Sequence, residues 1–296
     1  MVSPSVLAHT TNLDLVIRHV LAGLGHGIHA GVERGAGVEF SEYRAYVPGD
    51  EWRRVDWKLL ARADRYYVRE AERDSHVAVW LVLDATASMA EPSRSIADLD
   101  KITYARAILA CIAAIAQRQG DAFGLLVLSD GRTQFTPAAR GPRQLHRILA
   151  QLQKAEPLGQ LPATAALKSA LHFARSPSLI IAASDFLDWP SPLSEALLRL
   201  RHMRHDVRAL LLQTQAECDA DFASGAYRDP EAEGNLHPGV FGFDKAMQGA
   251  YTAARDAHFG AVKAHSRQHD VPMLAARIEQ SPGEVLRALL KQAGRR

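Results

Sequence analysis

Apolar, strand-like runs alternate with helical patterns along most of this chain. Residues 76–83 read HVAVWLVL, a nearly continuous apolar stretch that fits a strand covered on both faces. Residues 101–119 repeat apolar side chains at helical spacing, and Gly120 ends the run. The alternation predicts further strands at 122–128, around 133–135, and at 179–183, 207–212 and 271–275, with helices at 142–154, 164–174, 192–203, about 243–269 and 283–292. Strands separated by helices of this length predict an α/β fold, a doubly wound and mostly parallel sheet flanked by helices.

The first 75 residues follow a different pattern. Residues 13–24 predict an amphipathic helix that packs onto a later element, because their apolar side chains recur every three or four positions. Residues 39–72 are dense in Arg, Asp, Glu and Trp and resemble neither a simple helix nor a linker. We therefore expect a leading segment over 1–75, with an N-terminal helix and irregular or extended chain, and an α/β domain with a C-terminal extension over 76–296.

Composition narrows the class of protein. A chain of 296 residues, 47% of them hydrophobic, is too apolar for disorder and can bury one large core with an appendage. A net charge of +2 provides no field that would draw the molecule to nucleic acid or to an anionic membrane. Charged residues interrupt the helical run at 13–24, and no basic segment precedes it, which disfavours a signal peptide. The sequence thus predicts a cytoplasmic protein without direct membrane insertion or a nucleic-acid partner.

Oxygen-bearing side chains lie at the predicted carboxyl ends of two strands. Asp84, Thr86 and Ser88 follow the first buried strand at alternate positions, Asp185 ends the run LIIAASD, and Thr164 begins a predicted helix. Ligands of open α/β sheets bind outside the carboxyl ends of strands, so these five residues converge if the two strands are neighbours. Oxygen ligands suit the hard cations Mg²⁺ and Mn²⁺. Each residue alone also fits a cap of a helix or loop, and only their joint placement indicates a metal site.

A family resemblance supports the metal-site interpretation. From Val77 to about Leu212 the chain resembles a von Willebrand factor A domain, which implies a von Willebrand factor A-like fold. Its metal-ion-dependent adhesion site is matched here by Asp84, Thr86, Ser88, Thr164 and Asp185. Two features depart from that pattern: the first hydroxyl is a threonine where the family usually has serine, and the loop LGQLPAT before Thr164 lacks the usual glycine pair.

The stretch from Gly35 to Met89 resembles more closely the bacterial family catalogued as domain of unknown function 58. The matching segments are YVPGDEWRRVDWKLLAR, VREAE and LDATASM. Members of this family are commonly encoded beside MoxR-type AAA+ ATPases. The resemblance therefore implies a non-enzymatic adaptor or co-chaperone that binds such an ATPase.

The Arg- and Trp-rich block within the leading segment allows two interpretations. Its acidic and basic residues nearly cancel, which disfavours binding to phosphates of nucleic acid. The block is either a folded ion-pair network whose tryptophans pack on the α/β domain, or a contact surface for a partner, since Trp and Arg are enriched at interface hot spots. The residues expected at such a contact are Arg44, Trp52, Arg53, Arg54, Trp57 and Arg62.

Two alternatives to a binding module remain. A metal-dependent phosphohydrolase of the haloacid dehalogenase type also carries an Asp at a strand end, but it needs a second acid two residues later, where this chain has Thr86. No G-x-S-x-G motif and no P-loop is present. The other alternative is a purely structural domain that binds no metal. We expect a protein that is not an enzyme.

Overall fold

The computed structural model describes residues 4–8, 12–24, 42–46, 57, 66–70, 78–170, 177–222, 225–228 and 240–291. The contacts divide the chain into two compact units, one formed by residues 1–28 together with 77–296, and the other by residues 29–76. The predicted leading segment 1–75 is therefore divided, because its first helix belongs to the larger unit. In the smaller unit, strand β1 (Glu42–Ala45) pairs antiparallel with β2 (Tyr67–Glu70).

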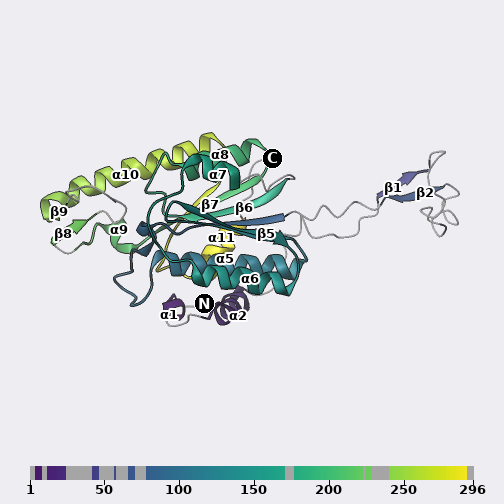
Figure 1. The fold of residues 1–296 in the computed structure, drawn as a ribbon, viewed down its shortest axis with the longest axis horizontal. Helices are drawn as coiled ribbons and strands as arrows, with labels where there is room; N and C mark the ends of the chain where they lie inside the picture. The colour runs from purple at the N-terminus through teal and green to yellow at the C-terminus, as the bar shows by residue number, and fades with distance from the viewer. Residues whose placement is uncertain are drawn as a thin grey trace. The chain divides into compact units, whose positions relative to one another are not determined.

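A six-stranded sheet forms the centre of the larger unit (Figure 1). The strand order is β10-β7-β6-β3-β4-β5, and every neighbouring pair is parallel except the antiparallel pair β4–β5. The strands are β3 (Ala78–Asp84), β4 (Phe123–Ser129), β5 (Arg132–Ala139), β6 (Ser178–Ser184), β7 (Asp206–Gln213) and β10 (Met273–Arg277). This arrangement confirms the predicted fold class, and it makes β3 and β6 direct neighbours.

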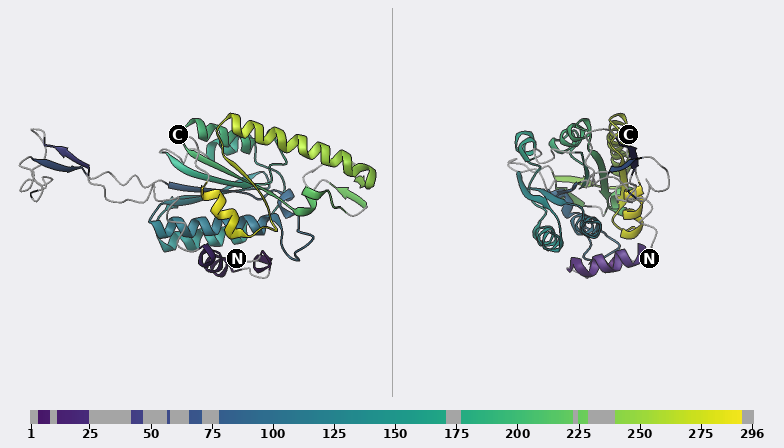
Figure 2. Two further views of the ribbon diagram at one scale, coloured as in Figure 1. Left: turned by 180° about the vertical axis from the view of Figure 1, so that it is seen from behind. Right: turned by 90° about the vertical axis from the view of Figure 1, so that its right-hand side faces the viewer.

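Helices cover both faces of the sheet (Figure 2). One face carries α5 (Lys101–Gln119), α6 (Pro142–Lys154) and α11 (Pro282–Lys291). The other carries α7 (Thr164–Ala170), α8 (Pro192–His202) and α10 (Lys245–Gln268). Each set of helices buries the side chains that β3 presents to its face, so the two cores alternate along that strand: Leu81 lies in one, and Trp80 and Val82 lie in the other.

The N-terminal helices form a further layer outside α5. Helix α2 (Leu13–Leu24) packs against α5 and α11, and the short α1 (Ser5–Ala8) also contacts α5. Val16, Val20 and other apolar residues of α2 join the same core as α5, which confirms the predicted packing of this helix. Helix α5 is therefore enclosed between the sheet and α2, which explains why it is apolar on most of its surface.

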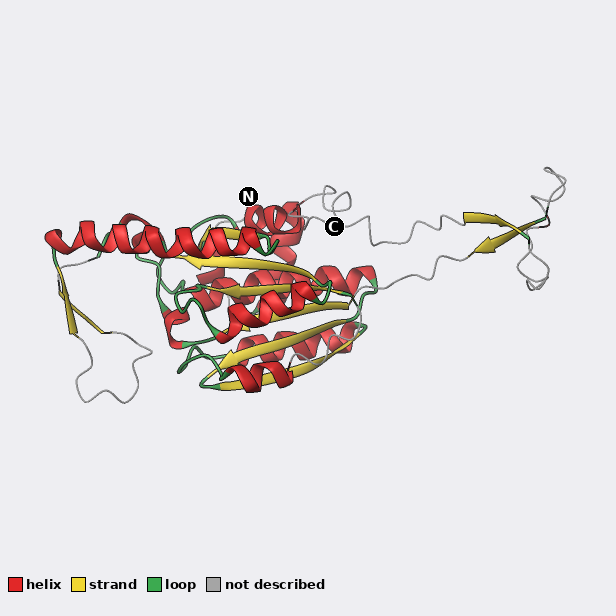
Figure 3. Ribbon diagram, turned by 90° about the horizontal axis from the view of Figure 1, so that it is seen from above, coloured by secondary structure: helices red, strands yellow, loops and turns green. Residues whose placement is uncertain are grey.

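Three short elements between β7 and α10 were not predicted. The polar stretch after β7 contains α9 (Gln215–Asp219) and strand β8 (Gly225–Arg228), which pairs antiparallel with β9 (Val240–Phe243). This strand pair lies beside the first residues of α10 (Figure 3). Elements of four or five residues carry too few positions for a hydrophobic period to emerge. Among the helices that the structure describes, none combines the length and the hydropathy needed to cross a bilayer.

Candidate functional site

The parallel pairing of β3 and β6 brings two polar strand ends together. Leu83 is paired with Ala183, so the next residues of the two strands, Asp84 and Ser184, are neighbours. Ser184 donates a hydrogen bond from Oγ to Oδ2 of Asp84 at 2.6 Å. Asp185 follows directly, and both aspartates are buried at the same edge of the sheet. The convergence predicted for these strand ends is therefore present.

The turn after β3 places two hydroxyl groups next to Asp84. The backbone N and the Oγ1 of Thr86 both donate to Oδ1 of Asp84, at 3.0 and 2.9 Å. Oγ1 of Thr86 lies 3.2 Å from Oγ of Ser88, which is in the short 3-10 turn Ala87–Ala90. Adjacent ligands of an octahedral ion with bonds of about 2.1 Å are about 3.0 Å apart. Because Thr86 gives its hydroxyl hydrogen to Asp84, its oxygen keeps lone pairs for a cation.

These groups line a small hollow of about 10 Å³, close to the smallest space that can hold one water molecule. Its lining includes four of the five predicted ligands, while Thr164 is not among the lining residues. Thr164 is half-buried at the start of α7. The residues that line the hollow are Asp84, Thr86, Ser88, Leu161, Ser184, Asp185, Phe186, Asp188 and Ser191.

Three of these oxygen-bearing residues were not predicted from the sequence as part of the site. Ser184 directly precedes Asp185, and its place at the end of a buried strand was a usable signal. Ser191 caps α8, where its Oγ accepts a hydrogen bond from the backbone N of Ser194. Asp188 is exposed in the loop between them, and nothing in its local sequence separates it from an ordinary loop acid.

The loop between α6 and α7 closes one side of the hollow. Leu158 donates from its backbone N to the carbonyl of Ala85 at 3.0 Å, and Ala87 donates to the carbonyl of Gly159 at 2.9 Å. Gly159 has a φ of +61°, and a Cβ there would lie 2.8 Å from Cα of Asp130. Glycine is needed at this position, because the loop passes too close to the end of β4 for a side chain.

Burial dominates the electrostatics of Asp84. Its side chain is almost fully enclosed, and burial together with the nearby Asp185 raises its pKa from 3.8 to about 7. Hydrogen bonds from Ser184 and Thr86 favour the charged form and offset part of this rise. A cation in the hollow would oppose both effects that raise the pKa of Asp84, because it would neutralise the buried carboxylate and screen it from Asp185.

Asp185 is already paired with a cation of the protein. Lys101, the first residue of α5, donates from Nζ to Oδ2 of Asp185 at 3.0 Å and to Oε1 of Glu217 at 2.6 Å. Burial opposes the charge on Lys101, but the two carboxylates outweigh it and raise the pKa of its ammonium group.

The chemistry of the donors fits a hard divalent cation. Every donor that faces the hollow is an oxygen, and the two hydroxyls of Thr86 and Ser88 lie at a spacing that one ion can bridge. Within the described residues, no group of three or more His, Cys, Asp and Glu side chains is arranged to hold a metal. A metal bound here would therefore depend on neutral hydroxyl ligands and a small number of carboxylates, and the described lining offers none of the soft ligands that favour zinc or copper.

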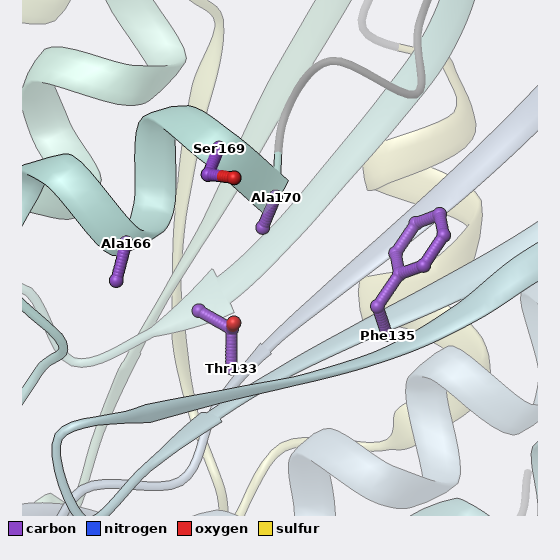
Figure 4. A pocket seen from close by; sticks show the side chains of 5 residues that line it. All are labelled: Thr133, Phe135, Ala166, Ser169 and Ala170. Carbon is purple, nitrogen blue, oxygen red and sulfur yellow. The ribbon is translucent and has the colours of Figure 1, made fainter.

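A second, larger cavity of about 440 Å³ opens between β5 and α7 (Figure 4). Its lining residues are Thr133, Phe135, Ala166, Ser169 and Ala170. None of these side chains titrates near neutral pH or supplies a carboxylate. Among the described residues, the lining of this cavity therefore supplies none of the groups that acid–base or metal chemistry requires.

The expected partner-contact residues lie in the smaller unit. Arg44 belongs to β1, and Trp57 is 56% exposed. Trp52, Arg53, Arg54 and Arg62 lie outside the described residues. Both interpretations of the Arg- and Trp-rich block, an ion-pair network and a partner surface, therefore stay predictions.

Fold and site together define an α/β protein with an oxygen-lined candidate cation site at the carboxyl edge of its central sheet. The chain belongs to the family described as "Protein of unknown function DUF58", whose model matches residues 42–258. This finding confirms the resemblance drawn from the motifs between Gly35 and Met89.

Similar proteins include the uncharacterized protein Rv1480 of Mycobacterium tuberculosis and the uncharacterized protein Mb1516 of Mycobacterium bovis. Each is 29% identical over 290 residues, which cover 94% of this chain and 86% of the relative. Among solved structures, the chain is similar to the conserved hypothetical protein BatB from Bacteroides thetaiotaomicron, with a TM-score of 0.44 and 13% identity over 73% of this chain and 100% of that one. It is also similar to the SpRpn10 VWA domain, with a TM-score of 0.42 and 10% identity over 71% of this chain and 93% of that one.

Proposed function

We propose that this chain is a non-enzymatic, metal-dependent protein-binding module. Asp84, Thr86, Ser88 and Asp185 would hold Mg²⁺ or Mn²⁺ at the carboxyl ends of β3 and β6. The observation that carries the proposal is the pair of hydroxyl oxygens 3.2 Å apart beside a buried carboxylate, in a hollow of about 10 Å³. A cavity of that size accommodates an ion and excludes a metabolite.

The charge balance favours binding through the ion. Hydroxyl ligands add no charge, and Lys101 already shares Asp185. A bound divalent cation would keep part of its positive charge toward the opening, where it attracts an anionic side chain. A carboxylate from a partner protein therefore suits the remaining coordination position. Asp84 and Asp185 would hold the ion from the side of the sheet.

The rim offers apolar contact area for such a partner. Leu158 is 55% exposed beside the turn of Asp84, and Leu187 is 46% exposed two residues after Asp185. Large aliphatic side chains on a surface contribute to association when a partner removes them from water. We expect the partner to present an acidic residue with apolar neighbours.

We propose a MoxR-type AAA+ ATPase as the partner, so that the chain acts as an adaptor or co-chaperone. Support comes from membership of the DUF58 family and from the motifs shared with it between Gly35 and Met89. The Arg- and Trp-rich block of residues 39–72 would supply a second contact area. Nucleotide hydrolysis belongs to the partner in this scheme, because the chain contains no P-loop.

Retention of a purified MoxR-type ATPase on the immobilised chain tests this proposal. The ATPase itself needs Mg²⁺, so the metal is kept constant and the chain is varied instead. Ser88→Ala removes one proposed ligand, and Ser169→Ala removes an exposed hydroxyl from α7 as the matched control. We expect retention to be lost with Ser88→Ala and kept with Ser169→Ala. Equal retention by both variants would overturn the role of the metal site in partner binding.

A phosphohydrolase is the second candidate, and Asp188 is the observation that favours it. This exposed acid lines the same hollow as Asp84, so two carboxyl groups with different environments face one site. A hydrolase would turn over p-nitrophenyl phosphate in Mn²⁺, and the activity would vanish in Asp84→Asn. If the wild type turns over no phosphate ester of a panel faster than Asp84→Asn does, the hydrolase candidate is excluded.

A further inference from the structure

Lys101 occupies an unfavourable position for a cation. Its side chain is 1% exposed, and it is the first residue of α5, where the helix dipole is positive. A buried ammonium without partners would lose its proton or destabilise the fold. Its hydrogen bonds to Asp185 and Glu217 must therefore be strong enough to offset both penalties.

The partners of Lys101 are themselves held in place. Glu217 accepts from the backbone N of Thr214 through Oε2 at 2.6 Å, as part of a capping box at the start of α9. Asp185 accepts from the backbone N of Leu187 through Oδ1 at 3.4 Å. The ammonium of Lys101 thus contacts one oxygen of each of these two carboxylates, and it occupies Oδ2 of Asp185.

We infer that Lys101 is a positioning residue that competes with the metal ion for Asp185 and keeps the metal affinity of the isolated chain low. The inference rests on the proposed metal site. Asp185 would face two cations, the ammonium on one oxygen and the ion in the hollow. Repulsion between these cations weakens metal binding until a carboxylate from a partner adds negative charge, so metal and partner bind cooperatively.

Glu217 acts in the opposite direction. Its carboxylate lies 2.6 Å from Nζ and cancels much of the charge that Lys101 directs toward the site. Removing the charge of Glu217 should weaken metal binding, and removing the charge of Lys101 should strengthen it. A purely structural role for the pair predicts weaker binding in both cases, since either change would loosen Asp185.

Mn²⁺ binding, followed by electron paramagnetic resonance of the free ion, distinguishes these cases. The variants are Lys101→Met, Glu217→Gln and their combination, with Lys263→Met on the exposed side of α10 as the matched control. We expect Lys101→Met to bind Mn²⁺ about tenfold more tightly than the wild type, because a nearby positive charge in a partly buried site is removed. Glu217→Gln should bind Mn²⁺ several-fold more weakly, because a negative charge that offsets Lys101 is removed. Lys263→Met should bind Mn²⁺ as tightly as the wild type.

Lys101→Met leaves the buried carboxylate of Asp185 and the partly buried carboxylate of Glu217 without this cation, so circular dichroism first establishes that the variant folds. If it does not fold, the same change is measured in the Glu217→Gln background, where one fewer charge is left unpaired. There the double variant should bind Mn²⁺ about tenfold more tightly than Glu217→Gln alone. Equal or weaker binding after loss of Lys101 in either background overturns the inference. Absence of Mn²⁺ binding by the wild type and every variant overturns the proposed metal site itself.

Discussion

Replacing Asp84 by asparagine should stabilise the metal-free protein at alkaline pH. The pKa of Asp84 is raised from 3.8 to about 7 in the folded chain, chiefly by burial and by Asp185. The folded state therefore binds more protons than the unfolded state between these two pH values, and the free energy of unfolding falls as pH rises through this window. A rise of roughly 3 pKa units corresponds to about 4 kcal/mol once both states are ionised.

The asparagine in Asp84→Asn keeps the shape of the native side chain without its charge. It can still accept from the backbone N and Oγ1 of Thr86, and the hydroxyl of Ser184 can turn to accept from its amide. Hydrogen bonds to a neutral amide are weaker than those to a carboxylate, which removes part of the gain. We expect a net stabilisation of about 2–4 kcal/mol at pH 8 in a chelator, shrinking toward zero near pH 4.

Urea unfolding at pH 8 and pH 5 in the presence of chelator measures this effect. Asp188→Asn is the matched control, because that acid also lines the hollow but is exposed, so its charge costs little. The difference between Asp84→Asn and the wild type should be larger at pH 8 than at pH 5. A less stable Asp84→Asn protein at pH 8, or a difference independent of pH, would refute the assignment of a buried and destabilising charge.

Three further predictions concern the site and the core. Mn²⁺ should raise the melting temperature of the wild type more at pH 8 than at pH 5.5, because protons compete with the ion for Asp84; an equal shift in Asp84→Asn would contradict this site. Gly124→Ala should cost about 2 kcal/mol or more, since its Cβ would overlap the ring of Trp80 and lie 2.9 Å from the carbonyl of Thr136. The added Cβ of Gly249→Ala in α10 meets nothing within 4 Å and should stabilise the protein by about 0.5–1 kcal/mol. Chemical denaturation should therefore give changes in the free energy of unfolding of opposite sign for Gly124→Ala and Gly249→Ala. Val20→Ala should cost about 2 kcal/mol by truncating a fully buried side chain at the contact of α2 with α5, whereas Leu15→Ala, at a position 44% exposed, should cost far less; equal losses would show that α2 does not contribute to this core.

Long, strongly periodic elements were predictable from sequence because their signals are local. The helix expected at 101–119 is α5 with the same bounds, since Asp100 caps its start and Gly120 ends it in the left-handed conformation. The strand β3 followed from its uninterrupted apolar run. In contrast, β8 pairs with a strand that follows it in the sequence only after residues 229–239, and neither β8 nor β9 is long enough to carry a pattern of its own.

The candidate site was only partly predictable. Asp84, Thr86 and Ser88 lie in one turn, so their spacing in the sequence places them together. Asp185 joined them only because β6 pairs with β3, and Thr164 does not line the hollow because the loop 155–163 crosses the strand ends before α7 begins. Lys101 offered no local signal, since it reads as an ordinary first residue of a helix and its partner Asp185 is 84 positions away.

Local patterns in the chain predicted the α/β class, the approximate bounds of the major helices and strands, the oxygen-bearing turn at Asp84 and membership of the DUF58 family. Each of these features depends on residues that are close together in the sequence. The folded molecule was needed to establish which strand ends meet, which hydroxyls enclose the hollow and which cation reaches Asp185. These features depend on strand order and on packing between distant segments. Burial in the assembled core, together with Asp185 from a distant strand, also raises the pKa of Asp84, and no neighbour in the sequence indicates this.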